Sequence, residues 1–276
     1  MVNILISGYY GFDNIGDESI LRTLVSSLRE HIPDCSLTVL SHNPASTREK
    51  YGVEAVDRMS PMAILRAVKK CDMLISGGGS LLQDVTSSKS LHYYLSIIRC
   101  AEFFHKKVFI YSQGIGPIDR PGNRRAAAAA LKKADGIVVR DERSAALLEE
   151  IGIARDKVVI TADPVIRMKK PDGDVGAEIL QKAGVSLGGR LTVGWAIRER
   201  DTDSRFVKEL LRSIRMMKDK YNAQSVLIPF HYEEDGEVCR HIAAQLPDDT
   251  AVCLNEKYLS EDMLSIIGNM DLLVGV

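Results

Sequence analysis

The sequence predicts an α/β fold in two domains, each built on an open parallel sheet with helices on both faces. Short apolar runs alternate with amphipathic helical segments along the chain, which is typical of this fold class. The runs are apolar at most positions, as in strands that are buried on both faces of a parallel sheet. A polar stretch with Pro and Gly, residues 169–174, interrupts the alternation, which then restarts. We therefore expect an N-terminal domain over residues 1–170 and a C-terminal domain over residues 171–276.

The elements of the first domain follow from this pattern in chain order. Strands are expected at the apolar runs of residues 4–7, 37–40, 73–76, 108–111, 137–139 and 158–160. Helices are expected between them, at residues 18–30, 62–70, 93–104, 124–133 and 144–151. In the first helix Leu21, Leu24 and Leu28 recur at helical spacing, which predicts one buried face.

The second domain repeats the pattern. Strands are expected at residues 191–195, 226–228, 251–254 and 271–276, and helices at residues 206–221, 238–245 and 264–267. The chain stops on its last strand, without the crossover that should cover it. We therefore expect a second domain that is truncated at its C-terminus. The exposed last strand would pair with another molecule or precede a segment absent from this chain.

Composition excludes several classes of protein. Lys and Arg number 36 and Asp and Glu 37, a net charge of −1, so no basic excess is available to neutralise a nucleic-acid backbone. No apolar run approaches the ~20 residues of a membrane helix, and the N-terminus lacks a signal peptide's basic region. The five cysteines contain no CxxC pair, which favours reduced thiols in a cytoplasmic protein over disulfides or a metal site.

Five loops that are rich in glycine or charge each follow a predicted strand of the first domain. They are residues 8–18, 76–84, 112–117, 140–144 and 161–164. The carboxyl ends of parallel strands meet at one edge of a sheet, which is where doubly wound folds bind ligands. The sequence therefore predicts one site at this edge.

The first loop, residues 8–18, leads from a strand into a helix and carries two acids, Asp13 and Asp17. It matches neither a P-loop nor the GxGxxG pattern. Two acids would repel a bare phosphate, but they suit a hydroxyl group or a proton transfer. Alternatively, Asp17 or Asn14 only caps the helix.

The second loop contains three consecutive glycines, which expose backbone N–H groups at a cost in stability. Alternatively, this loop has no binding role and is only a tight turn between strand and helix. Arg140 has the fork geometry to bind a carboxylate or phosphate, unless it pairs with Asp141 or Glu142.

Two loops of the second domain also follow strands. Arg198 and Arg200 are candidates to bind an anionic substrate. His231 is a candidate acid, base or hydrogen-bond donor, and a structural role is its alternative.

At these residues the chain resembles the polysaccharide pyruvyltransferase family, and most closely its CsaB-type members of bacterial cell-wall polymer assembly. The matching motifs run in order through the first domain and reach the loop at His231. They are residues 11–18, 77–84, 113–117, 140–144, 163–164 and 229–231.

The resemblance implies two Rossmann-like domains of the GT-B type, with the first domain on the acceptor side of the cleft. It implies phosphoenolpyruvate as co-substrate, with no separate cofactor. It implies N-acetylmannosamine in a lipid-linked secondary cell wall polymer precursor as acceptor, and a 4,6-linked pyruvate ketal that anchors surface-layer proteins. It also implies a cytoplasmic enzyme, with peripheral contact to the inner membrane face as a further option. The family's C-terminal loop with Arg and His is expected beyond Val276.

We assign Asp17 as the catalytic acid–base residue and assign no metal ligand. The residues expected to bind substrate are Asp13, Asn14, Gly16, Gly77, Gly78, Gly79, Ser80, Gln113, Gly114, Arg140, Arg198, Arg200 and His231. Two other functions stay open: a nucleotide-sugar glycosyltransferase on the same fold, and a non-catalytic carbohydrate-binding protein.

Overall fold

Two parallel sheets form the framework of the chain in the computed structural model, which describes residues 1–85 and 87–275. Contacts divide the chain into two units. The first contains Met1–Phe12 and Gly16–Met168, and the second contains Asp13–Ile15 and the chain from Lys169 onward. Val276, where the last strand is predicted to end, lies outside the described residues.

The first unit contains a seven-stranded sheet in the order β3-β2-β1-β4-β5-β6-β7, and every recorded pairing is parallel. Its strands are β1 (Val2–Tyr10), β2 (Cys35–Ser41), β3 (Glu54–Asp57), β4 (Met73–Gly77), β5 (Lys107–Gln113), β6 (Gly136–Val139) and β7 (Val158–Ile160). The chain proceeds outward from β1 to β3 and then crosses back to β4. The topological switch point, where such folds bind ligands, therefore lies between β1 and β4.

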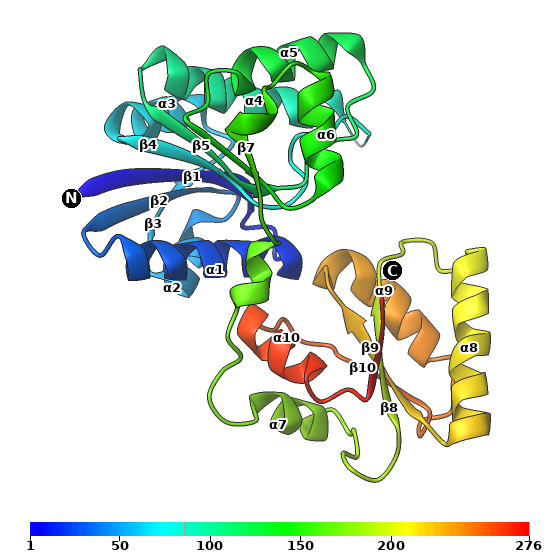
Figure 1. Cartoon of the computed structure of the whole chain (residues 1–276). Coiled ribbons are helices and arrows are strands. Elements are labelled where there is room, and N and C mark those ends of the chain that lie inside the picture. The colour runs from blue at the N-terminus through cyan, green and yellow to red at the C-terminus, as the bar shows by residue number, and fades with distance from the viewer. Residues whose placement is uncertain (86, 276) are drawn as a thin grey trace. The chain divides into compact units, whose positions relative to one another are not determined.

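Helices cover both faces of this sheet, with α1 and α2 on one face and α3 to α6 on the other (Figure 1). Their bounds are α1 (Ile15–His31), α2 (Pro44–Tyr51), α3 (Pro61–Lys70), α4 (Ser88–Phe103), α5 (Pro121–Leu131) and α6 (Glu142–Glu150). Two short 3₁₀ helices follow, Arg155–Lys157 and Pro164–Arg167. Leu21 and Leu24 of α1 are buried against one face of the sheet, and Leu95 and Ile98 of α4 are buried against the other.

The second unit repeats this architecture on a four-stranded parallel sheet in the order β10-β9-β8-β11. Its strands are β8 (Thr192–Ile197), β9 (Gln224–Pro229), β10 (Ala251–Cys253) and β11 (Leu272–Gly275). Its helices are α7 (Val175–Lys182), α8 (Arg205–Tyr221), α9 (Tyr232–Ala243) and α10 (Ser260–Ile267). One buried cluster joins α8 and α9 to the sheet, and another joins α7 and α10 to it.

Every strand and helix predicted above is present, so the α/β fold with parallel sheets is confirmed. Among the described residues, the additional elements are β3, α2, α7 and the two 3₁₀ helices. β1 is longer than predicted, because it continues beyond Ser7 through a register shift to Tyr10. The five cysteines are free thiols, three buried and two half-buried. Among the described residues, no helix is both long and apolar enough to cross a membrane.

Three glycines, Gly77 at the end of β4 and Gly78 and Gly79 after it, allow the first turns of α1 to approach the loop closely. A Cβ atom at Gly78 would lie 2.0 Å from Ile20 Cγ2, and one at Gly79 would lie 2.9 Å from Asp17 Oδ1. Gly78 and Gly79 also adopt positive φ angles of +33° and +74°. The loop is not the tight turn of the alternative interpretation, since β4 ends at Gly77 and α4 begins only at Ser88. Its glycines are required by packing and by backbone conformation.

We therefore predict that Gly78→Ala destabilises the first unit by about 1–3 kcal/mol, because the new methyl group overlaps Ile20. Gly122→Ala is the matched control. Gly122 lies in α5 with nothing within 4 Å of the added Cβ, so this change should be neutral or stabilising. Urea unfolding monitored by far-UV circular dichroism compares the two variants. Equal midpoints would contradict the packing constraint.

Candidate functional site

Asp17 and the glycine loop lie at the same edge of the first sheet, at the switch point between β1 and β4. Asp17 is the third residue of α1, and its carboxylate borders Gly79, as described above. Because α1 begins at Ile15, Asp17 lies inside the first turn and is not the residue that precedes the helix. Asp17 therefore does not occupy the N-cap position that the capping alternative requires. The helix N-terminus still favours a negative charge there.

Glu18, the next residue, holds the first loop in place. Its side chain is buried, and its Oε1 accepts a hydrogen bond from the Gly11 N–H at 2.8 Å. Its Oε2 accepts a hydrogen bond from the Tyr51 hydroxyl of α2. A buried carboxylate with such donors fixes the path of the chain between β1 and α1. Sequence reasoning missed this role, although an acid directly after the glycine-rich loop was the available signal.

Arg140 joins three other loops of this edge. Its Nη1 donates to Asp163 Oδ2 at 2.8 Å, and its Nη2 donates to Ser80 Oγ at 3.0 Å. Its Nε lies 3.9 Å from Asp141 Oδ2, so the main carboxylate partner is Asp163 and not the neighbour in sequence. A Cβ atom at Gly114 would lie 2.9 Å from Arg140 Nη2, so Gly114 leaves room for the guanidinium.

These two groups flank one short stretch of backbone. Asp17 borders Gly79, and Arg140 bonds to Ser80, the next residue. The edge therefore offers a carboxylate for proton transfer and a guanidinium for an anion at adjacent positions.

Two predicted ligand-binding groups are already occupied by internal hydrogen bonds. Gln113 is fully buried, and its Nε2 donates to Ser76 O at 2.9 Å and Ser76 Oγ at 2.8 Å. It therefore connects β5 to β4 instead of lining the surface of the site. The Gly78 N–H likewise donates to the Tyr111 carbonyl at 3.0 Å, so this group is not an exposed donor.

Tyr10 is buried beside the glycine loop. A Cβ atom at Gly77 would lie 2.8 Å from its hydroxyl oxygen. Burial, reinforced by the negative charge of Asp17, raises the pKa of Tyr10 well above its usual range, so the hydroxyl stays protonated. Among the described residues neither this hydroxyl nor Gln113 Oε1 has a hydrogen-bond partner.

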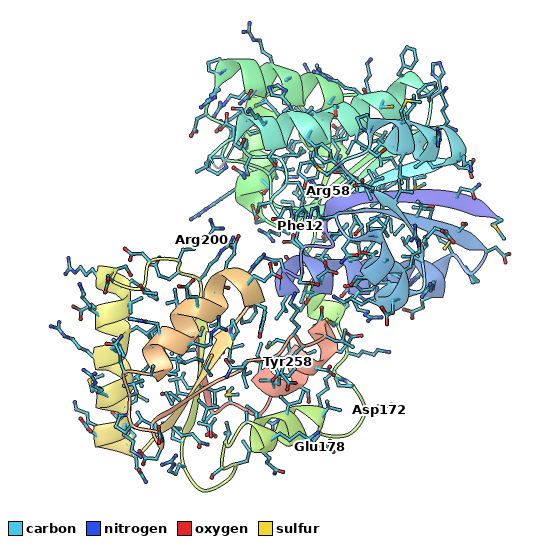
Figure 2. The ribbon with its side chains drawn as sticks, turned by 180° about the vertical axis from the view of Figure 1, so that it is seen from behind. Phe12, Arg58, Asp172, Glu178, Arg200 and Tyr258 are labelled. Carbon is cyan, nitrogen blue, oxygen red and sulfur yellow. The ribbon has the colours of Figure 1, made fainter. Side chains whose placement is uncertain are left out.

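Arg58, which sequence reasoning did not single out, is a buried cation surrounded by aromatic rings. Arg58 lies beside Phe12 (Figure 2). Its guanidinium carbon is 5.1 Å from the centre of the Phe12 ring and 4.7 Å from that of Tyr93. Its Nη1 donates to the Gly8 carbonyl at 2.9 Å, which ties the end of β3 to β1. Phe12 stacks in turn between Tyr9 and His42, with ring centres 4.1 and 4.4 Å away. This cluster gives the first loop a rigid side.

The predicted residues of the second unit lie around the start of α9. His231 precedes that helix, and its Nδ1 accepts a hydrogen bond from the Glu234 N–H at 3.3 Å. The backbone N–H of His231 donates to Asp235 Oδ2 at 2.7 Å. Burial raises the pKa of the Asp235 carboxyl. This reciprocal cap matches the structural alternative for His231. Arg200 pairs with Glu234, and Arg198 is exposed.

Asp13 and Asn14 belong to the second unit by their contacts. Asp13 Oδ2 accepts a hydrogen bond from Lys257 Nζ at 3.0 Å, and Asn14 forms an isolated antiparallel bridge with His231. Gly16 is exposed in the first turn of α1. Within the described ranges, no three His, Cys, Asp or Glu side chains gather as a metal site requires.

The sequence matches the polysaccharide pyruvyl transferase family over residues 14–276. The amylovoran biosynthesis protein AmsJ of Erwinia amylovora is 22% identical over 239 residues, which cover 72% of this chain. The same alignment covers 57% of AmsJ, so the chain spans less than two thirds of that relative's length.

Two solved structures share the fold at low sequence identity. Anabaena HepE, solved with UDP and glucose, aligns with a TM-score of 0.62 at 12% identity, over 99% of this chain and 73% of HepE. The UDP-GlcNAc 2-epimerase of Neisseria meningitidis, solved with UDP-GlcNAc, aligns with a TM-score of 0.63 at 13% identity, over 100% of this chain and 77% of the epimerase. These similarities confirm the GT-B-like α/β fold.

The loop between β4 and α4 yields a prediction on pH. Burial of Asp84 opposes its ionisation, but hydrogen bonds from the Asp119 N–H, the Asn123 side chain and the Arg120 N–H outweigh it and lower its pKa. Its contribution to stability is therefore present above the unfolded pKa of about 3.9 and is lost as the pH falls through the folded value. We expect Asp84→Asn to reduce stability at neutral pH by about 1–3 kcal/mol.

The difference from the wild type should shrink as the pH falls through the folded pKa of Asp84, because the carboxyl is then neutral like the amide. Urea midpoints across this range measure it, with Asp119→Asn, which changes an exposed carboxylate nearby, as the control. A difference that stays constant with pH would contradict the assignment.

Proposed function

The chain belongs to the polysaccharide pyruvyl transferase family, and from this membership we propose that it transfers pyruvate from phosphoenolpyruvate to a sugar hydroxyl pair as a ketal. The observation that carries the proposal is the arrangement at the switch point, where Asp17 borders Gly79 and Arg140 bonds to Ser80. The name of AmsJ, a protein of amylovoran biosynthesis, supports a role in polysaccharide assembly.

The proposed acceptor is N-acetylmannosamine in a lipid-linked secondary cell wall polymer precursor, modified as a 4,6-ketal in the cytoplasm. This follows from the resemblance of the motifs at residues 11–18 and 77–84 to CsaB-type enzymes. A sugar diol suits a carboxylate such as Asp17, because each hydroxyl must lose a proton as it attacks.

The reaction balances without an oxidant or reductant. C3 of phosphoenolpyruvate takes up a proton, which makes C2 cation-like. One sugar hydroxyl adds to C2 and loses its proton, and the second hydroxyl then displaces phosphate from the same carbon. Two C–O bonds form at C2, and the bond from C2 to the phosphate oxygen breaks. One hydroxyl proton balances the proton gained by C3, and the other leaves with inorganic phosphate.

In this proposal Asp17 is the acid–base residue, and the basic side chains hold the donor's charges. Arg140 presents its planar guanidinium at the edge next to Ser80, where a carboxylate or phosphate of the donor would replace Asp163 as its anionic partner. Arg198 and Arg200 follow β8 and are exposed, so an anionic substrate can reach them. Such cations are needed because the leaving phosphate is negatively charged, and the arginine side chains would stabilise that charge.

The direct test incubates the full chain with phosphoenolpyruvate and a lipid-linked N-acetylmannosamine acceptor. Inorganic phosphate release and the mass of the product are measured, and a parallel reaction contains UDP-sugars. Phosphate release together with a ketal in the product supports the proposal. Sugar transfer from a UDP-sugar would replace it with the glycosyltransferase function. Acceptor binding with no turnover of either donor would replace it with carbohydrate binding.

We predict that Asp17→Asn lowers turnover by ~10²–10⁴-fold, because an amide cannot exchange the required proton. Stability should fall by no more than about 1 kcal/mol, the contribution of a charge in the first turn of a helix. The matched control is Asp34→Asn, an exposed acid before β2, at the opposite edge of the sheet. Phosphate release and melting temperature are measured for both variants. Turnover near the wild-type value with Asp17→Asn would remove this residue from the proton transfer.

A further inference from the structure

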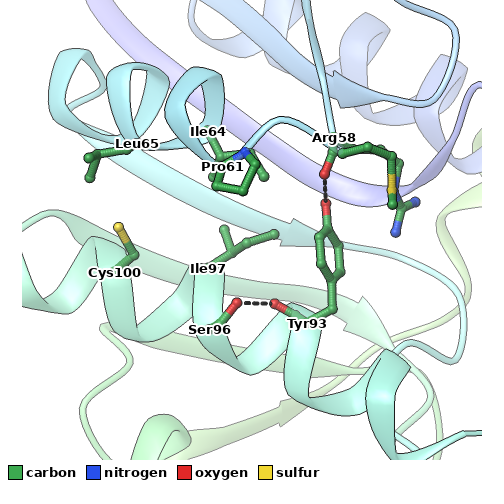
Figure 3. Close-up of a pocket in the computed structure, with 9 residues that line it drawn as sticks. Arg58, Pro61, Ile64, Leu65, Tyr93, Ser96, Ile97 and Cys100 are labelled. Atoms are coloured by element: carbon green, nitrogen blue, oxygen red, sulfur yellow. Dashed lines mark hydrogen bonds between the residues drawn. The ribbon is translucent and has the colours of Figure 1, made fainter.

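A groove in the first unit lies between two helices and away from the glycine loop. Figure 3 shows Ile64 and Leu65 of α3 on one side of it and Ile97 and Cys100 of α4 on the other. Its volume is about 440 Å³, and its lining is mostly apolar. At one end the Tyr93 hydroxyl donates to the backbone carbonyl of Arg58 at 3.0 Å. Nothing in the reaction proposed above uses this groove.

Large apolar side chains lie exposed around the two helices. Met59 lines the groove and is 68% exposed, Met62 in the first turn of α3 is 60% exposed, and Phe103 at the end of α4 is 75% exposed. A groove together with exposed apolar side chains marks an interaction surface more strongly than scattered residues do.

The charges on α3 and α4 are almost all positive. Five basic residues of the two helices are exposed: Arg66, Lys69, Lys70, Lys89 and Arg99. The single acid on either helix is Glu102, which is half-buried. Lys69 Nζ also lies 5.2 Å from the centre of the Phe104 ring, so a cation and an apolar ring share one side of the surface. Apolar groups bordered by cations fit the interface of an anionic membrane.

Basic charge alone does not identify a membrane-binding surface, because α8 is also rich in basic residues. That helix also carries several Lys and Arg residues, but its apolar residues Val207, Leu211 and Ile214 are buried in the core of the second unit. Its exposed large apolar side chains are Met216 and Tyr221 near its C-terminal end, so the rest of its basic face has little apolar surface to insert, and α8 provides an internal control.

We propose that the α3–α4 surface, formed by Met59, Met62, Phe103, the groove and the basic residues around them, docks peripherally on an anionic phospholipid bilayer. The apolar side chains enter the interface, and the basic residues contact the lipid phosphates. The proposal goes beyond the pyruvyl transfer reaction and does not require turnover, although a lipid-linked acceptor would be presented at such a surface. Its failure is therefore distinguishable from failure of the proposed function.

The first test is co-sedimentation of the full chain with vesicles of phosphatidylglycerol and phosphatidylcholine, compared with phosphatidylcholine alone. We expect binding to the anionic vesicles that weakens with salt. Each basic residue near such a surface contributes about a fivefold factor to the binding constant, so Lys69→Gln with Lys70→Gln should reduce it about 25-fold. Met59→Ser with Met62→Ser should also reduce it. The matched control on α8, Lys208→Gln with Arg212→Gln, should change it little.

The second test reports on insertion. A tryptophan introduced by Met62→Trp should be quenched by brominated lipids in anionic vesicles, whereas Met216→Trp on α8, also an exposed methionine, should not. Absence of binding to anionic vesicles would overturn the proposal. So would an equal loss with the α8 variant, or equal quenching at both positions. A change in oligomeric state with Met59→Ser and Met62→Ser, without a change in vesicle binding, would assign the groove to a second copy of the chain and also overturn it.

Discussion

The close approach of α1 to the glycine loop is the constraint on which the candidate site depends. Only glycine leaves space at positions 78 and 79 for Ile20 and for the Asp17 carboxylate, and both positions have positive φ angles. Because Leu21 and Leu24 are buried against the sheet, moving α1 outward to accommodate a larger side chain would expose them. The position of Asp17 at the carboxyl edge therefore follows from core packing, and not from a flexible loop that happens to lie nearby.

Buried charged groups then fix the neighbouring loops. Glu18 accepts the Gly11 N–H, Arg58 donates to the Gly8 carbonyl, and Asp84 accepts two backbone N–H groups at the start of α5. Each of these bonds joins a charged side chain to a backbone group, and such bonds are stronger than neutral ones. Loops with few apolar residues thereby keep one conformation, since leaving any of these charges unpaired inside the unit would be costly.

The sequence was sufficient for the parts of the fold that carry a strong periodic pattern. Apolar runs located every strand except β3, whose residues EAVD include two acids at the edge of the sheet and so form no apolar run. α2 has little apolar periodicity, although Asn43 and Pro44 at its start were a usable signal. The position of loops after strands predicted a shared edge of the sheet, and the structure brings Asp17 to Gly79 and Arg140 to Ser80 at that edge. Pairings such as Glu18 with Tyr51 and Arg58 with Tyr94 join residues 33 and 36 positions apart, and periodicity carries no information on such contacts.

The carboxylates that hold the loops differ from those that pair with arginines in how readily an anionic ligand could replace them as hydrogen-bond partners. Glu18, Asp84 and Asp235 are buried and accept backbone N–H groups, so replacing them would unpair groups inside the protein. Asp163 and Glu234, whose side chains are 36% and 39% exposed, pair with Arg140 and Arg200. Such exposed pairs contribute at most about 1 kcal/mol each. A carboxylate or phosphate that approaches either arginine therefore exchanges one anionic partner for another at little cost, while the buried acids keep the surrounding loops unchanged.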